Sequence, residues 1–280
     1  MTAIPLAPAL AKENSVSDYR ERTFRWLERG EGEPVLFLHG LMGRMDNWER
    51  TLDLLGSEAC RPMALALPIF EPWLREPSIE ALADHVRSFL DALEIPRVVL
   101  GGNSLGGHLA LRVALAAPER ISGLILTGSS GLFERGFTRG VPHRPSAAFV
   151  REKMKEVVHD STLVTPEWCE SVRQLVNAPA SAMRVLRCAR AAKRDNVEER
   201  LGNIRPPTLL VWGREDRITP PEVAERFRRL IPDAELLYLS SCGHAPMLEW
   251  PERFAAAVAW WLRSSRERRA VVSLTAGAAR

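Results

Sequence analysis

The sequence predicts a doubly wound α/β domain with a mostly parallel sheet and a helical segment inserted after the sixth strand. Three observations lead to this prediction. Short runs rich in Val, Leu and Ile alternate with segments of helical periodicity along most of the chain. These runs are nearly continuous in apolar residues, which is typical of parallel strands that helices cover on both faces. The alternation stops at residue 131 and resumes near residue 204, which marks the inserted segment.

Size, composition and charge narrow the class of protein. The chain has 280 residues, enough to bury a full core, and its 46% hydrophobic and 26% charged residues are ordinary for a globular protein. A net charge of +3 with both signs interspersed argues against nucleic acid and anionic membranes as partners. No run of about 18 apolar residues is present. The first fifteen residues lack a basic segment and contain prolines, so we expect a loose arm, no signal peptide and a cytoplasmic protein.

The first strands and helices follow from local patterns. Residues 18–29 alternate between polar and apolar side chains, which predicts one or two edge strands. Residues 34–40 and 61–68 are apolar runs and predict two buried strands. Between them, residues 47–56 have helical spacing, and Gly56 is expected to end that helix.

The next elements surround the most informative stretch of the chain. Helical spacing runs from Ser78 to Leu93, with Ser78 as the expected N-cap. An apolar run at 98–100 then predicts the central strand, and a helix follows it directly. Residues 121–130 predict a further buried strand that ends in small polar residues.

Residues 131–203 contain no strand-like run and are expected to be a helical cap. They begin with a Gly/Arg/Pro-rich stretch and continue with three helical patterns, at 147–158, 165–176 and 178–194. Insertions in such sheets leave from the carboxyl ends of strands, where ligands bind, so we expect a lid over the site. Residues 1–130 and 204–280 would then form the core domain.

The remaining chain returns to the strand–helix rhythm. The patterns predict strands at 207–213 and 235–241, and helices at 221–231 and 251–265. The tail from Arg266 has little to bury, so we expect it to fray.

The central strand ends in a motif that indicates a nucleophile. Gly102-Asn103-Ser104-Leu105-Gly106 has the form G-x-S-x-G and lies between an apolar strand and a helix. A serine on so tight a turn has a strained backbone, and glycines two residues away relieve the crowding around it. The new helix begins directly behind the serine, with its positive end toward the reacting centre.

A serine nucleophile needs a base and a group that orients the base. Asp216 directly follows the strand at 207–213, and His244 follows the strand at 235–241. Because parallel strands end at the same edge of a sheet, we expect Ser104, Asp216 and His244 to meet there as nucleophile, orienting acid and base. Glu215 and Glu134 are the competing carboxylates. The other histidines lie in predicted helices (His85, His108) or in the insertion (His143, His159).

An oxyanion intermediate needs hydrogen-bond donors as well. The backbone N–H of Leu105 is one candidate, because it follows the nucleophile. The second is expected from the loop after residues 34–40, at Leu41 or alternatively at Met42. We expect His39 to shape that loop through hydrogen bonds and not to react.

Cysteine and histidine spacing gives no sign of a metal site. The four cysteines, Cys60, Cys169, Cys188 and Cys242, are far apart, so free buried thiols are expected instead of disulfides or a zinc site. Cys242 lies beside the candidate base but has no base of its own in the sequence, and we interpret it as packing. We expect a reaction that needs no metal and no cofactor.

Four motifs together resemble the α/β-hydrolase superfamily: HGLMG (39–43), GNSLGG (102–107), GREDRITP (213–220) and CGHAPMLEWPERF (242–254). The resemblance extends over residues 18 to 262 and implies an α/β-hydrolase fold. More narrowly, the chain is similar to capped serine hydrolases, which include small carboxylesterases and the carbon–carbon bond hydrolases of meta-cleavage products. The latter often have Asn before the nucleophile, as this chain has Asn103.

The chain departs from the carbon–carbon hydrolases in two motifs. Those enzymes usually have an aromatic residue after the catalytic histidine, where this chain has Ala245, and their glycine-rich loop is only HGLMG here. The segment 67–73 also differs from many relatives. It brings Phe70 and Trp73 to the active face, where they line the pocket or pack on the sheet.

The resemblance and the residues together predict a serine hydrolase that cleaves a carboxylic ester of a small to medium, mainly apolar substrate. Carbon–carbon bond hydrolysis is the alternative, a non-catalytic ligand receptor is a remote one, and a haloperoxidase-like side reaction stays open. Oligomeric state is not predicted. We expect substrate contacts from Met42, Asn103, Phe133, Phe137 and Trp168. Further lid candidates are Phe149, Met154 and Met183, and Arg173 or Arg184 for a substrate carboxylate.

Overall fold

A computed structural model describes residues 14–17, 23–58, 60–134 and 144–277. They form one eight-stranded sheet with the strand order β1-β2-β4-β3-β5-β6-β7-β8. The strands β1 and β2 pair antiparallel, as do β2 and β4, and all other neighbours are parallel. The strands are β1 (Asn14–Ser17), β2 (Thr23–Glu28), β3 (Glu33–Leu38), β4 (Cys60–Leu65), β5 (Val98–Asn103), β6 (Ile121–Thr127), β7 (Thr208–Gly213) and β8 (Ala234–Leu239). The predicted mostly parallel α/β sheet is confirmed.

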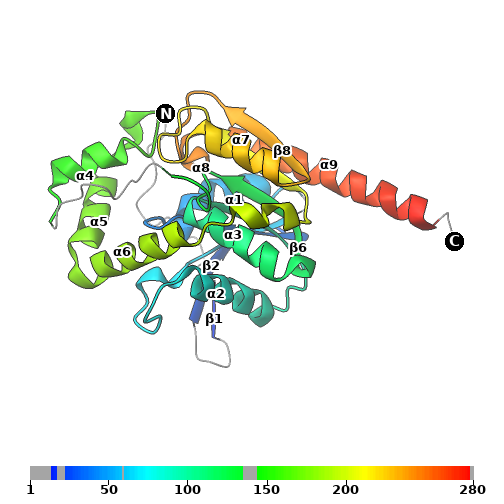
Figure 1. Cartoon of the computed structure of the whole chain (residues 1–280), viewed down its shortest axis with the longest axis horizontal. Helices are drawn as coiled ribbons and strands as arrows, with labels where there is room; N and C mark the ends of the chain where they lie inside the picture. Colours follow the sequence, from blue (N-terminus) through cyan, green and yellow to red (C-terminus); the bar gives the residue numbers. More distant parts are fainter. Residues whose placement is uncertain (1–13, 18–22, 59, 135–143, 278–280) are drawn as a thin grey trace.

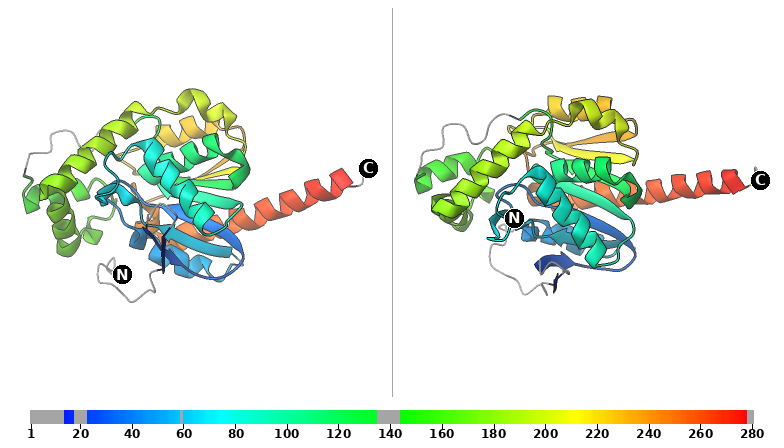
Figure 2. Two further views of the ribbon diagram at one scale, coloured as in Figure 1. Left: turned by 90° about the horizontal axis from the view of Figure 1, so that it is seen from below. Right: turned by 60° about the horizontal axis from the view of Figure 1, so that its bottom comes forward.

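Helices cover both faces of this sheet (Figures 1 and 2). One buried cluster joins the sheet to α2, α3 and α7, and includes Phe89, Leu109 and Phe227. The other joins it to α1 and α9 and includes Trp48 and Trp261. The helices are α1 (Glu49–Leu55), α2 (Ile79–Ala92), α3 (Leu105–Ala116), α4 (Ala147–Met154), α5 (Pro166–Asn177), α6 (Pro179–Arg194), α7 (Pro221–Leu230), α8 (Pro246–Glu249) and α9 (Pro251–Gly277), with 3-10 turns at Met45–Trp48, Pro68–Phe70, Pro118–Arg120, Ser161–Leu163 and Glu198–Asn203.

Two predicted helix ends are confirmed at the level of their caps. Ser78 is the N-cap of α2, and its side chain accepts a hydrogen bond from the Ala81 N–H. Gly56 is the C-cap of α1, and its N–H donates to the Leu52 carbonyl. Among the described residues, no helix is long and apolar enough to span a membrane.

The segment between β6 and β7 is helical, as the sequence predicts. It contains α4, α5 and α6, which lie together at one end of the molecule in Figures 1 and 2. The side chains of Ser146 and Thr165 cap α4 and α5 by accepting backbone N–H bonds. The segment has a small apolar cluster of its own, which includes Val150, Met154 and Val172. Cys188 and Ala192 of α6 belong to the core cluster, so the segment is packed internally as well as against the core domain.

The structure corrects two expectations about the ends of the chain. The predicted loose arm is wrong at its end, because Asn14 and Ser15 belong to β1 and pair with β2; residues 1–13 lie outside the described residues. The predicted fraying from Arg266 is also wrong, because α9 continues to Gly277 and extends away from the sheet in Figure 2. Buried Trp261 anchors this helix, and each further residue of an existing helix adds a backbone hydrogen bond without a new nucleation cost.

Candidate active site

Ser104 lies at the turn between β5 and α3 in a strained conformation, with φ +55° and ψ −118°. Positive φ is unfavourable for a residue with a side chain. The flanking glycines make the turn sterically feasible: a Cβ at Gly102 would lie 2.3 Å from the Gly106 carbonyl carbon, and one at Gly106 would lie 2.1 Å from the Leu38 oxygen. The crowding that the G-x-S-x-G motif predicts is present.

Backbone hydrogen bonds from a neighbouring strand hold this turn in place. The Ser104 N–H donates to the Thr127 carbonyl at 3.2 Å, at the end of β6. The Ser104 carbonyl accepts from the Ser130 N–H and from the His108 N–H, each at 3.1 Å. The strained residue is therefore fixed by β6 and its following loop as well as by its own helix.

His244 and Asp216 form a buried pair on the two neighbouring strand ends. The His244 Nδ1 donates to Asp216 Oδ2 at 2.9 Å. Three further bonds orient the carboxylate: Oδ1 accepts from the Ile218 and Thr219 N–H groups at 2.8 and 2.9 Å, and Oδ2 accepts from Thr219 Oγ1 at 2.8 Å. Because Nδ1 is bound, the imidazole has only Nε2 left for chemistry.

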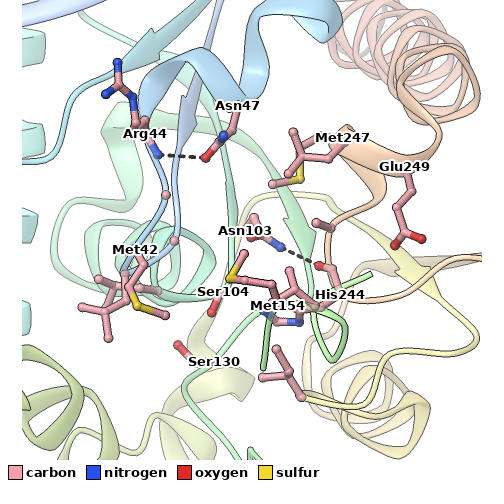
Figure 3. Close-up of a pocket in the computed structure, with 18 of the residues that line it drawn as sticks. Met42, Arg44, Asn47, Asn103, Ser104, Ser130, Met154, His244, Met247 and Glu249 are labelled. Atoms are coloured by element: carbon pink, nitrogen blue, oxygen red, sulfur yellow. Dashed lines mark hydrogen bonds between the residues drawn. The ribbon is translucent and has the colours of Figure 1, made fainter. Parts of the chain in front are cut away.

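Ser104 and His244 line one cavity, and the residue before Ser104 is hydrogen-bonded to the His244 backbone. The side chain of Asn103, the residue before Ser104, donates from Nδ2 to the His244 carbonyl at 2.8 Å. Figure 3 shows this bond, with the Ser104 and His244 side chains near each other. The three predicted triad positions therefore converge at the carboxyl edge of the sheet, as expected from their places after β5, β7 and β8.

Opposing effects act on the pKa of His244. Burial disfavours the charged imidazolium and lowers the pKa, but the adjacent Asp216 carboxylate raises it through its charge and its hydrogen bond. Glu134 and Glu249 add smaller contributions in the same direction, and the net result is a raised pKa. The site thus stabilises a protonated His244, which a base needs after it accepts a proton.

The structure decides between Asp216 and the competing carboxylates. The Glu215 carboxylate turns away and accepts the Cys242 N–H at 2.9 Å, and Glu134 makes no hydrogen bond to His244. The competing histidines are elsewhere: His85 packs against Phe24, and buried His108 lies 3.8 Å from Asp195. Exposed His159 does not line the cavity, and His143 lies outside the described residues.

The predicted oxyanion donors lie at the cavity wall. Leu41, Met42 and Leu105 all line it, and the N–H groups of Leu41 and Leu105 have no acceptor within the described part of the chain. His39 shapes the donor loop as expected: Nε2 accepts the Leu67 N–H at 3.0 Å and Nδ1 donates to the Gly40 carbonyl at 2.8 Å. Burial lowers the pKa of His39 to about 4, so its imidazole is neutral near pH 7.

The cavity has a volume of about 1670 Å³ and a largely apolar wall near Ser104. Its apolar lining comes from the loops after β3 and β7, from the helical insertion and from the His244 loop with α8. It includes Leu41, Met42, Met154, Val157, Trp168, Ile218, Ala245 and Met247. Charged residues also line the cavity: Arg44, Asp46, Glu49, Arg50, Asp53, Glu134, Asp160, Lys193, Glu249 and Glu252. The apolar part of the wall is thus suited to an uncharged, apolar group.

The predicted substrate contacts divide into three groups. Met42 and Trp168 line the cavity, and Phe133 lines it with 61% of its surface exposed. Asn103 also lines it, but both donors of its amide are bound within the protein, to the carbonyls of Thr127 and His244. Phe137 lies outside the described residues.

Several alternative contacts are not part of the cavity wall. Met154 lines it, but Phe149 and Met183 do not, and Met183 is 48% exposed. Arg173 pairs with Glu170 on its own helix, and Arg184 donates to the Leu74 carbonyl at 2.6 Å. Neither arginine is placed to meet a substrate carboxylate.

The segment 67–73 is separate from the cavity too. Phe70 packs against the core cluster, and Trp73 is 41% exposed and lies against His85. Of the two alternatives for these residues, packing on the core holds for Phe70, while Trp73 lies at the surface.

Three residues of the site were not identified from the sequence. Thr219 orients Asp216 through its hydroxyl and N–H. Gly128 has φ +52°, and a Cβ there would lie 2.7 Å from His244 Nδ1. Ser130 lines the cavity with a buried hydroxyl that has no hydrogen-bond partner within the described residues. The run Gly128-Ser129-Ser130 directly after β6 was the sequence feature from which Gly128 and Ser130 could have been identified.

No metal centre is found in the part of the chain that the structure describes, because no three His, Cys, Asp or Glu side chains gather there. All four cysteines are free and buried, as expected. Burial raises the pKa of the Cys242 thiol far above its ordinary value, so it is protonated and unreactive near pH 7. Its predicted packing role fits this environment.

A serine at a strand-to-helix turn, which shares a cavity with a buried acid–histidine pair, is the arrangement that hydrolases of the α/β class use. The fold and the site therefore define such a hydrolase. The chain belongs to the alpha/beta hydrolase family, whose family model matches residues 35–257.

Relatives within this family act on different substrates. The 2-hydroxymuconate semialdehyde hydrolase of Pseudomonas putida is 30% identical over 92% of this chain and 96% of the relative. The dihydrolipoyllysine-residue acetyltransferase component of the acetoin cleaving system from the same organism is 31% identical over 86% of this chain and 67% of the relative. Among solved structures, a membrane phospholipase A has a TM-score of 0.82 at 27% identity and covers 91% of this chain and 86% of its own. Membership therefore shows a hydrolase and leaves the bond that it cleaves open.

Proposed function

We propose that this hydrolase is a serine esterase that cleaves carboxylic esters of small to medium, mainly apolar compounds through an acyl-enzyme. The observation that carries the proposal is the convergence of Ser104 with the buried Asp216–His244 pair on an apolar cavity. A small-molecule ester would be the substrate, and the steps below require no metal and no cofactor.

We propose a role in the reaction for each of these residues. Ser104 Oγ attacks the ester carbonyl carbon while His244 Nε2 takes the hydroxyl proton, and Asp216 stabilises the imidazolium that forms. The Leu41 and Leu105 N–H groups bind the oxyanion of the tetrahedral intermediate. His244 then protonates the leaving alcohol, which departs and leaves the acyl group on Ser104. A water molecule, deprotonated by His244, releases the acid in a second addition and elimination.

The helical insertion is the proposed lid, with residues 131–203 as a cap domain. Met154, Val157 and Trp168 from this segment form one side of the cavity, opposite the sheet edge that carries Ser104. An apolar acyl group would be buried between the two, which removes water from the reacting centre. The mainly apolar character of this wall is the reason for proposing apolar substrates.

Carbon–carbon bond hydrolysis of a vinylogous diketone acid is the second candidate. The 30% identity to a 2-hydroxymuconate semialdehyde hydrolase over nearly the whole chain favours it. Against it, small Ala245 occupies the position after His244, and neither Arg173 nor Arg184 lines the cavity. Arg44, Arg50 and Lys193 do line it, so the cavity does not lack cations for a substrate carboxylate. We place ester hydrolysis first because of the apolar wall beside Ser104.

One panel separates these functions. Wild type, Ser104→Ala and the exposed control Ser57→Ala are assayed with p-nitrophenyl acetate, butyrate and octanoate and with a meta-cleavage product. Ester turnover that Ser104→Ala abolishes and Ser57→Ala retains supports the esterase. Turnover of the diketone acid alone supports the second candidate. Unchanged ester turnover by Ser104→Ala contradicts the nucleophile assignment, and tight binding without turnover by the wild type indicates a receptor.

A further inference from the structure

The helical insertion is joined directly to the loop that carries His244. The His244 N–H donates to the Val157 carbonyl at 2.8 Å, just after α4. The candidate base therefore takes part of its backbone support from the lid and not from the core sheet alone.

Glu249 adds a second connection between the same two segments. Its Oε1 accepts the Gly243 N–H at 2.6 Å, and its Oε2 accepts the N–H groups of His159 and Asp160 at 2.7 and 3.2 Å. One oxygen thus binds the His244 loop and the other binds the insertion. Figure 3 shows Glu249 and His244 on the same side of the cavity.

The two segments are also in close steric contact at Gly243. A Cβ at this position would lie 2.8 Å from the His159 nitrogen and 3.0 Å from the Val157 oxygen. Real Cβ atoms do not approach backbone atoms so closely, so any other residue would push the segments apart. The His244 loop and residues 157–160 are therefore packed too closely to admit a side chain at position 243.

We propose that Glu249 is a positioning residue that holds residues 157–160 of the insertion and the His244 loop as one rigid unit. In this structure the lid wall and the catalytic base do not move independently, because separation breaks the Val157–His244 bond and the Glu249 bonds together. The inference rests on the proposed function for the role of His244.

A direct catalytic role for Glu249 does not fit the contacts. The imidazole Nδ1 is already bound by Asp216, and both Glu249 oxygens are used by backbone N–H groups. Burial raises the pKa of Glu249, and the three N–H bonds act against that rise. These contacts fit a structural carboxylate that binds backbone N–H groups of two segments.

The test removes the bridging carboxylate of Glu249 and keeps the size of the side chain. Glu249→Gln has a single accepting oxygen, so it cannot bind both segments as the carboxylate does. Glu215→Gln is the matched control. Among the described residues Glu215 accepts only the Cys242 N–H of the His244 loop, and a glutamine carbonyl can still accept that bond. Steady-state kinetics with p-nitrophenyl butyrate, the unfolding midpoint and amide hydrogen exchange of a peptide covering residues 155–163 are measured for both.

For Glu249→Gln we expect about tenfold faster exchange in residues 155–163 and a kcat about tenfold lower, with KM within about threefold. Glu215→Gln should leave exchange and kcat within about twofold. Unchanged exchange in Glu249→Gln would show that Glu249 does not hold residues 157–160 to the His244 loop. Faster exchange with unchanged kcat would show that this connection does not position His244. A role in stability alone would lower the unfolding midpoint without this split between kcat and KM.

Two further measurements decide the matter if Glu249→Gln does not fold. In the wild type, the amides of His159, Asp160, Gly243 and His244 should exchange at a common opening rate; separate rates overturn the proposal. Gly243→Ala should separate the segments sterically and reproduce the kcat loss. Because exchange needs no substrate, an inactive wild type would refute the esterase while the exchange data still support or overturn the connection through Glu249.

Discussion

The side chain of Asn103 is hydrogen-bonded to the backbone carbonyl of His244, with 2.8 Å between Nδ2 and O. The same Nδ2 donates to the Thr127 carbonyl at 3.1 Å. The residue before Ser104 therefore joins the ends of β5 and β6 to the His244 loop. Asn103 was predicted as a substrate contact and lines the cavity, but both of its amide hydrogens are bound inside the protein, so we expect it to position His244.

Asn103→Asp should lower kcat/KM about 10- to 100-fold. The substitution keeps the size of the side chain but replaces two N–H donors with an oxygen that faces two carbonyls, each loss costing about 1–3 kcal/mol. Ester hydrolysis and chemical denaturation measure both consequences. Full activity with an unchanged unfolding midpoint would show that the two bonds do not position the base.

Asp216→Asn should lower kcat about 10³- to 10⁴-fold, because the amide cannot stabilise the imidazolium and favours the wrong tautomer of His244. Thr219→Val is a milder substitution at the same pair and should lower kcat less than Asp216→Asn. It removes one bond to Oδ2 but leaves the His244–Asp216 bond, so we expect a loss of about tenfold. Single-turnover acylation rates for both variants check the order, and equal losses would contradict it.

The activity should have an acidic limb with a midpoint above the ordinary histidine value of 6.5, because the pKa of His244 is raised and the base must be neutral. A raised pKa also means that protonated His244 stabilises the folded state. That contribution is fully present below pH 6.5 and is lost as the pH rises through the folded pKa.

Rate profiles of kcat/KM from pH 5 to 9 measure the first effect. Unfolding midpoints of wild type and His244→Gln over the same range measure the second. His39 has the opposite sign, because burial lowers its pKa to about 4, but it is present in both proteins and cancels in their difference. An acidic midpoint below 6.5 would contradict the effect of Asp216.

Gly128→Ala should inactivate the enzyme more than it destabilises it. A Cβ at this position would lie 2.7 Å from His244 Nδ1, and φ of +52° adds backbone strain of about 1–3 kcal/mol. Displacement of the imidazole should lower kcat about 100-fold. Gly202→Ala is the control, since a Cβ there has nothing within 4 Å. Similar kinetics for both variants would show that the His244 ring adapts to the added methyl group.

Much of the site was predictable because its residues lie in the loops that directly follow the strands. Ser104, Asp216 and His244 each directly follow an apolar run, and parallel strands bring their carboxyl ends to one edge whatever the details of packing. The G-x-S-x-G spacing likewise determines the local turn, since only glycine fits at positions 102 and 106. Local pattern is enough where chemistry depends on strand direction and on contacts between near neighbours.

The lid shows where local pattern is insufficient. Trp168 and Met183 both lie on predicted amphipathic helices, yet Trp168 lines the cavity and Met183 is half exposed. Each helix residue is rotated by about 100° from the next, so the face that meets the cavity depends on how the helices dock. That docking is decided by contacts far apart in sequence, such as that of Arg184 with the Leu74 carbonyl.

The sequence by itself determined the parallel sheet, the elbow at Ser104 and the order of nucleophile, acid and base, because these follow from strand direction and from sterics between neighbouring residues. Only the tertiary structure decided that Asp216 and not Glu215 reaches His244, that Asn103 supports the base, and that Glu249 joins it to the lid. These are hydrogen bonds between side chains and backbone groups distant in the chain. Tertiary packing determines which of these groups come within hydrogen-bond distance, and local sequence patterns do not predict it.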